Sequence, residues 1–103
     1  MAKKALEQLS ETMFYVLMAF HFGDFCGAEV TAWIADRTKG RVHMGPGTLY
    51  TILAQFESAG VLKPIDTQGR KKHYQITEKG RGIYSEEVTR LRQCVADAEE
   101  NES

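Results

Sequence analysis

The chain has few of the features that mark several large classes of protein. Only two of its 103 residues are cysteines, Cys26 and Cys94, which is too few and too widely spaced for a disulfide framework or a Cys-x-x-Cys metal site. Its most apolar stretch, residues 13–22, is about half of the roughly 20 residues that a membrane-spanning helix needs. Its start lacks the apolar core and cleavage site of a signal peptide. We therefore expect a cytoplasmic protein with no membrane partner.

Catalytic and ligand-binding patterns are also missing from the sequence. The three histidines, His21, His43 and His73, have no ligand spacing with one another or with the cysteines. No nucleophile, acid and base stand together, and no glycine-rich phosphate loop follows a strand. We therefore expect no enzyme, no catalytic residue, no metal and no cofactor. The two cysteines are interpreted as small buried hydrophobes on helices, with a redox-sensing thiol as the alternative.

A net charge of −1 conceals an uneven distribution of charge along the chain. Residues 1–36 carry −3, residues 37–73 carry +5 and residues 74–103 carry −3. The basic charge is thus concentrated in the middle third. This pattern predicts one cationic face on an otherwise acidic body, as expected of a nucleic-acid-binding protein.

Hydrophobic periodicity predicts three helices in the first sixty residues. The first, about 11–22, begins after the N-cap Ser10 and is apolar nearly all round, so we expect a second chain to help cover it. The second runs from Cys26 or Gly27 to residue 37. The third, about 47–59, buries a stripe made by Leu49, Ile52, Leu53 and Phe56.

A hairpin and a last helix complete the predicted order. Residues 61–65 and 72–76 are expected as strands joined by a polar, basic turn. Thr77 caps a helix over residues 78–98, where a heptad seam repeats at spacings of 4, 3, 4 and 3. The seam consists of Tyr84, Val88, Leu91, Val95 and Ala98.

Three helices followed by a two-stranded wing define a winged helix-turn-helix. The predicted fold class is therefore mainly α with a small β-hairpin, plus a C-terminal dimerisation helix. Residues 1–8 are expected to be a flexible N-terminus and residues 9–77 the DNA-binding domain. Residues 78–98 form the dimerisation helix, and residues 99–103 an acidic tail.

The third predicted helix is the natural DNA-recognition element, because an α-helix fits the major groove and reads base edges from its N-terminal part. Its outward face offers small polar groups, a tyrosine and free backbone N–H groups for a phosphate. These candidates are Gly47, Thr48, Tyr50, Thr51 and Gln55. The alternative is an ordinary solvated face of an amphipathic helix.

The turn of the hairpin gathers three fixed cations and a histidine in a short loop: Arg70, Lys71, Lys72 and His73. Such loops neutralise phosphates beside a groove, with little regard to base sequence. The alternative is a solvated turn. The position of the turn directly after a recognition helix favours double-stranded DNA as the partner.

The last helix and the first helix both have apolar surface that one small domain covers poorly. Pairing of two chains about a two-fold axis would cover both and would place two recognition helices on a symmetric operator. The predicted homodimer interface consists of Phe14, Leu17, Tyr84, Val88, Leu91 and Val95. The alternative is packing within one chain alone.

Two runs of residues, 45–50 (GPGTLY) and 74–80 (YQITEKG), resemble those of the PadR-like transcriptional regulators. The resemblance extends over about residues 9–95, and the length is similar to that of the compact subgroup with one C-terminal helix. It implies a dimeric repressor that a small-molecule effector or another signal releases from DNA. It also implies DNA contacts by six residues, Thr48, Tyr50 and Thr51 in the recognition helix and Arg70, Lys71 and Lys72 in the wing.

Two departures from that family limit the resemblance. Ala28 stands where members often have tyrosine, so a contact from that position is in doubt. The single tryptophan, Trp33, lies on the second predicted helix and not on the last, so a drug-stacking role cannot be carried over. Two other functions stay open, a winged-helix module that binds a protein, and a metal- or redox-responsive regulator that uses Cys26 or Cys94.

Overall fold

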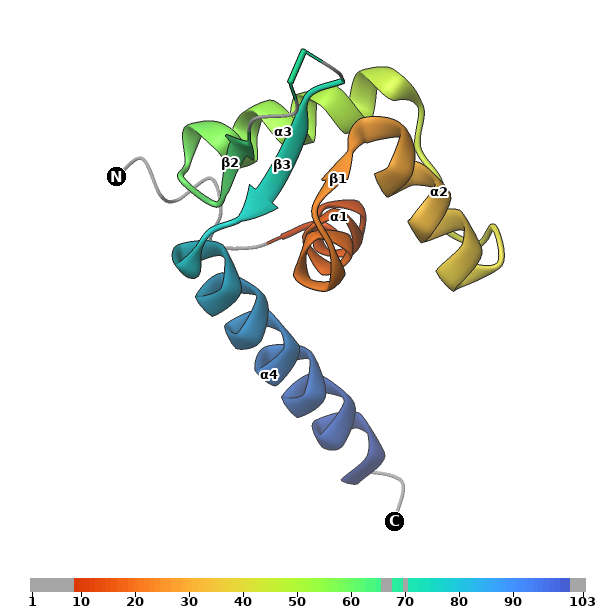
Figure 1. Ribbon diagram of the computed structural model, residues 1–103. Helices are drawn as coiled ribbons and strands as arrows, with labels where there is room; N and C mark the ends of the chain where they lie inside the picture. Colours follow the sequence, from red (N-terminus) through yellow and green to blue (C-terminus); the bar gives the residue numbers. More distant parts are fainter. Residues whose placement is uncertain (1–8, 66–67, 70, 101–103) are drawn as a thin grey trace.

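The computed structural model describes residues 9–65, 68–69 and 71–100, and its elements follow the predicted order with one addition (Figure 1). They are α1 (Glu11–Phe22), β1 (Phe25–Cys26), α2 (Gly27–Thr38), α3 (Pro46–Ser58), β2 (Leu62–Ile65), β3 (His73–Ile76) and α4 (Glu78–Glu100). The predicted fold class, mainly helical with a small sheet and a winged helix-turn-helix, is confirmed. The predictions for residues 1–8, for Arg70 and for residues 101–103 lie outside the described residues.

Capping residues fix the helix ends where the sequence predicted them. Ser10 Oγ accepts a hydrogen bond from the backbone N–H of Met13 at 3.1 Å, which satisfies one of the free donors in the first turn of α1. Thr77 Oγ1 does the same for the N–H of Gly80 at 3.0 Å in α4. Pro46 occupies the first turn of α3, where its fixed φ angle and missing N–H cost nothing.

The sheet has three antiparallel strands in the order β1-β3-β2, one more than the predicted hairpin. Strand β1 is only two residues long and pairs Phe25 with Tyr74 and Cys26 with His73. Cys26 therefore ends a strand and precedes α2, instead of lying within a helix. The wing, defined here as β2, β3 and the turn between them, is held to the helical part of the domain through β1.

The core lies between α1, α2, α3 and the inner face of the sheet. Leu17 has 0% of its surface exposed and packs with Val16, Phe20 and Phe56 inside this chain. Its predicted place in a dimer interface is therefore wrong, because α1 has one face that the other elements of the same chain bury completely. The rest of α1 is covered less completely, since Met13, Phe14 and Met18 are half-buried and Phe22 is 57% exposed, so the expectation that a second chain helps to cover this helix stays a prediction.

Helix α4 extends beyond the rest of the fold, and its C-terminal half points away from the wing (Figure 1). Cys94 lies on this half and is exposed, which contradicts the prediction that it is buried; Cys26 is buried as predicted. In the part of the chain that the structure describes, no helix is both long and apolar enough to cross a bilayer.

Candidate nucleic-acid interface

Helix α3 separates its residues cleanly into a buried stripe and an exposed face. Leu49, Ile52, Leu53 and Phe56 are buried, as predicted from their spacing. All five candidate DNA-contacting residues of this helix are exposed: Gly47, Thr48, Tyr50, Thr51 and Gln55. The hydroxyl of Thr51 donates to the carbonyl oxygen of Gly47 at 2.9 Å, and its oxygen still has lone pairs to accept a further hydrogen bond.

Tyr50 is the largest exposed side chain on this face, with 58% of its surface accessible. It lies beside the beginning of α2, where a Cβ atom added to Gly27 would stand 3.0 Å from the phenol oxygen. Glycine at this position leaves room for the ring. The aromatic side chain therefore lies at the junction between the two helices of the helix-turn-helix.

The wing is attached to α3 through Lys72. Its Nζ atom lies 3.5 Å from Glu57 Oε1 and 5.3 Å from the centre of the Tyr74 ring. The phenol of Tyr74 and, next, the carboxylate of Glu57 hold the pKa of Lys72 above its usual value. Lys71 and Lys63 are also exposed on the wing, and Lys63 was not among the predicted DNA contacts. The wing thus adds lysines beside the recognition helix.

The imidazole of His73 contacts α2. Its Nε2 atom lies 3.2 Å from Glu29 Oε1 of α2, and its Nδ1 atom lies 2.8 Å from the carbonyl oxygen of Lys71. Both ring nitrogens therefore face groups of this chain, and the side chain is half-buried. This is not the outward position expected from its place in the basic turn.

Two other cations of the basic middle third are placed away from α3. Arg37 lies over the Trp33 ring, 4.7 Å from its centre, and also over Phe22. Arg41 donates to Tyr15 Oη at 2.8 Å and to Glu11, and these two hydrogen bonds raise the pKa of its guanidinium. The cations that the structure describes in this part of the chain are therefore divided between the wing and the surface of α1 and α2.

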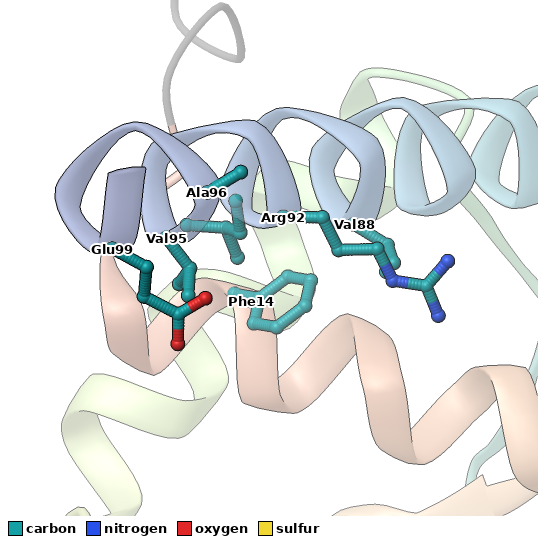
Figure 2. Close-up of a pocket in the computed structure, with 7 residues that line it drawn as sticks. Phe14, Val88, Arg92, Val95, Ala96 and Glu99 are labelled. Carbon is teal, nitrogen blue, oxygen red and sulfur yellow. The ribbon is translucent and has the colours of Figure 1, made fainter. Parts of the chain in front are cut away.

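A groove runs between the start of α1 and the C-terminal half of α4 (Figure 2). It has a volume of about 330 Å³ and is lined by Phe14, Val88, Leu91, Arg92, Val95, Ala96 and Glu99. Phe14 also stacks on Tyr84 within the chain, at 5.6 Å between ring centres. Val95, in contrast, has 54% of its surface exposed, so the predicted seam continues past the point where α1 covers it.

A family model, the Transcriptional regulator PadR-like family, matches residues 16–86. The chain belongs to this family. Its members are transcription regulators and not enzymes, and the winged helix that carries the exposed face of α3 is their DNA-binding fold. The resemblance stated from the two sequence runs is thereby confirmed.

Solved structures show the same fold. A transcriptional regulator from Clostridium thermocellum has a TM-score of 0.75 at 22% identity, over 85% of this chain and 89% of that one. A PadR family regulator from Clostridium difficile has a TM-score of 0.75 at 18% identity, over 91% of this chain and all of that one. Bacillus subtilis PadR, solved in complex with operator DNA, has a TM-score of 0.65 at 18% identity, over 74% of this chain and 45% of that one.

A curated relative comes from Streptomyces fradiae, an uncharacterised 37.1 kDa protein in transposon TN4556. It is 30% identical over 79 residues, which are 77% of this chain. The chain spans only 22% of the length of that relative.

Proposed function

We propose that this protein is a cytoplasmic, dimeric, sequence-specific transcriptional repressor that reads operator DNA with α3. The observation that carries the proposal is the exposed polar face in the N-terminal half of α3. Small hydroxyl and amide groups stand there around Tyr50, with the lysines of the wing beside the same helix. Bacillus subtilis PadR, a structural relative with the same fold, has been solved on operator DNA.

The groups on this face make three kinds of contact with DNA. Thr48, Thr51 and Gln55 hydrogen-bond to base edges in the major groove, where each type of base pair presents its own pattern of donors and acceptors. Tyr50 contacts a base or a phosphate at the edge of the helix. The backbone N–H groups around Gly47 lack intrahelical partners in the first turn and bind a phosphate.

The wing supplies binding that does not depend on base sequence. Lys71 and Lys72, with Arg70, neutralise phosphates beside the groove that α3 enters. Lys72 exchanges the carboxylate of Glu57 for a phosphate oxygen. This exchange costs little, because the pair is exposed and water and salt screen such surface ion pairs.

Dimerisation uses the part of α4 that α1 leaves uncovered. A second copy of α4, antiparallel to the first across a two-fold axis near Val95, buries the exposed valine in both chains. That arrangement places Arg92 opposite Glu99 of the partner subunit, so the two charged ends of the groove complement each other. The groove also has the size of a small-molecule site, about 300 Å³ or more, and we assign the effector to it; because the second copy of α4 uses Arg92, Val95 and Glu99 of the same groove, an effector bound there would compete with the dimer.

The proposal is tested by selecting duplexes that the protein binds from a random pool, followed by footprinting on the enriched sequence. We expect two half-sites related by two-fold symmetry, with centres about one helical turn, or about 10 base pairs, apart. The triple variant Thr48→Ala, Thr51→Ala, Gln55→Ala should lose the preference for this sequence and keep non-specific binding. The control variant Ser85→Ala, exposed on α4, should retain the preference.

Failure to enrich any sequence would contradict the proposal. The same result would favour a winged-helix module that uses this face for a protein partner, because a protein-binding face has no reason to select a base sequence.

A further inference from the structure

Three side chains from three different elements converge at the base of the wing. Cys26 ends β1, Glu29 lies in the first turn of α2 and His73 begins β3. Cys26 and His73 are direct partners across the antiparallel strands, and Glu29 is placed beside them by the start of α2. One ligand atom from each residue, the Cys26 sulfur, a Glu29 carboxylate oxygen and a ring nitrogen of His73, lies within 4.8 Å of the other two.

The orientation of His73 is that of a metal-binding imidazole. Its Nδ1–H donates to the carbonyl oxygen of Lys71 at 2.8 Å, which leaves the lone pair on Nε2. Histidine ligands of metals are commonly oriented in this way by a backbone carbonyl on the second nitrogen. Nε2 then faces Glu29 Oε1 at 3.2 Å. Two acceptors this close need a cation between them, either a proton or a metal ion.

The other two groups distinguish a metal ion from a proton. Glu29 accepts a hydrogen bond from the backbone N–H of Cys26 at 2.9 Å, which keeps the carboxylate ionised and fixed in place. The buried Cys26 places its sulfur atom in the same space, where it also takes part in the capping box at the start of α2, and a proton shared by His73 and Glu29 would not require this third group. A thiolate, an imidazole and a carboxylate together form a donor set that suits Zn²⁺, while Mg²⁺ and Ca²⁺ prefer oxygen alone.

We propose that Cys26, Glu29 and His73 bind a thiophilic divalent metal ion, with Zn²⁺ as the expected ion. Metal–ligand bonds of about 2.0 to 2.3 Å in a tetrahedron place ligand atoms about 3 to 4 Å apart. The distance of 3.2 Å from His73 Nε2 to Glu29 Oε1 already lies in this range, and all three ligand atoms lie within 4.8 Å of one another, so small shifts of the side chains complete the site. Binding displaces the proton of the Cys26 thiol into solvent, and water fills the fourth position.

An ion at this site would join the wing to α2. His73 follows Lys72 directly, and Cys26 precedes Gly27, the residue against which Tyr50 lies. The ion would therefore fix the lysines of the wing relative to the recognition helix. This effect on DNA rests on the proposed function, whereas metal binding itself does not.

The test is titration of the full-length, tag-free, reduced protein with Co²⁺, followed by displacement with Zn²⁺. We expect a sulfur-to-cobalt charge-transfer band and tetrahedral visible bands that Zn²⁺ removes. Cys26→Ser, Glu29→Gln and His73→Gln should each weaken Co²⁺ affinity by about tenfold or more, since loss of even an outer partner costs about 10 to 100-fold. The controls Cys94→Ser and His43→Gln, at an exposed thiol and an exposed imidazole, should bind as the natural chain does.

Circular dichroism of each variant before titration separates loss of a ligand from loss of the fold. A natural chain without the charge-transfer band overturns the proposal. A band that survives Cys26→Ser and disappears in Cys94→Ser also overturns it. Operator affinity is then measured with Zn²⁺ and with a chelator. Metal binding without any DNA binding would leave the site in place and contradict only the proposed function.

Discussion

The phenol oxygen of Tyr50 lies so close to the first residue of α2 that a Cβ atom at Gly27 would stand 3.0 Å from it. The ring of Tyr50 would also be 3.3 Å from the added atom, as would a methyl group of Leu49. Both distances are tighter than an ordinary van der Waals contact. The absence of a side chain at Gly27 therefore sets where the exposed aromatic of α3 projects.

Gly27→Ala should move Tyr50 and weaken operator binding, because the exposed ring can shift into solvent; the buried Leu49 must also give way slightly, so circular dichroism checks that the fold is kept. We expect a loss of about 1 kcal/mol, roughly fivefold in Kd, the size of one good base contact. Fluorescence anisotropy on the selected operator measures it. Ala32→Ser, at an exposed position further along α2, is the matched control. Unchanged affinity in Gly27→Ala would show that the position of Tyr50 does not matter for DNA.

Removing the lysines of the wing should change the salt dependence of DNA binding more than it changes the preference for the operator sequence. Each phosphate contact contributes about one to the slope of log Kd against log salt, so Lys71→Ala with Lys72→Ala should lower that slope by about 2. Arg81→Ala, an exposed cation on α4, serves as the control. The account of the wing fails if the slope of the double variant equals that of the natural chain.

Val95→Asp should convert the protein from dimer to monomer. The substitution places a charge on a valine that is 54% exposed in one chain and buried in the proposed interface. Sedimentation velocity reports the change in mass, and operator affinity should fall with it because two half-sites can no longer be bound together. Thr89→Asp, outside the seam of α4, should remain dimeric. A Val95→Asp protein that still dimerises would place the interface elsewhere.

Gly80→Ala should destabilise the fold at the junction of the wing and α4. A Cβ atom there would stand 2.5 Å from the carbonyl oxygen of Val61 and 2.7 Å from a carbon of Ile76, and neither neighbour can move easily. We expect a loss of about 1 to 3 kcal/mol in the free energy of unfolding, the usual cost of overpacking. Urea unfolding measures it.

Gly82→Ala, two residues later in the same helix, is the control for this effect. Its added Cβ atom meets no other atom within 4 Å. Alanine is favoured over glycine inside a helix by about 0.5 to 1 kcal/mol, so this variant should gain stability. Equal effects of the two substitutions would contradict the close approach at Gly80.

The helices and the wing could be predicted because their signals are local. Ser10 and Thr77 are capping residues, and the stripe of α3 has helical spacing, so neighbours in sequence determine these features. Strand β1 could not be predicted in this way. Its two residues have no periodicity of their own and become a strand only by pairing with Tyr74 and His73 of β3.

The errors concerning individual side chains have the same cause. Leu17 and Cys94 both lie on helices with apolar stretches, yet one is in the core and the other is exposed, because α4 extends beyond the body that α1 belongs to. The approach of His73 to Glu29 and Cys26 depends on strand pairing between residues far apart in sequence. No spacing rule along the chain detects such a cluster.

The central claim is that α3 and the wing bind a specific duplex. The most direct test is fluorescence anisotropy with the DNA upstream of the protein's own gene and with a scrambled duplex, across a series of salt concentrations. The account predicts tighter binding to the upstream duplex at every salt concentration, with the preference retained as non-specific binding disappears. Weak and equal binding to both duplexes that vanishes as salt rises would contradict it.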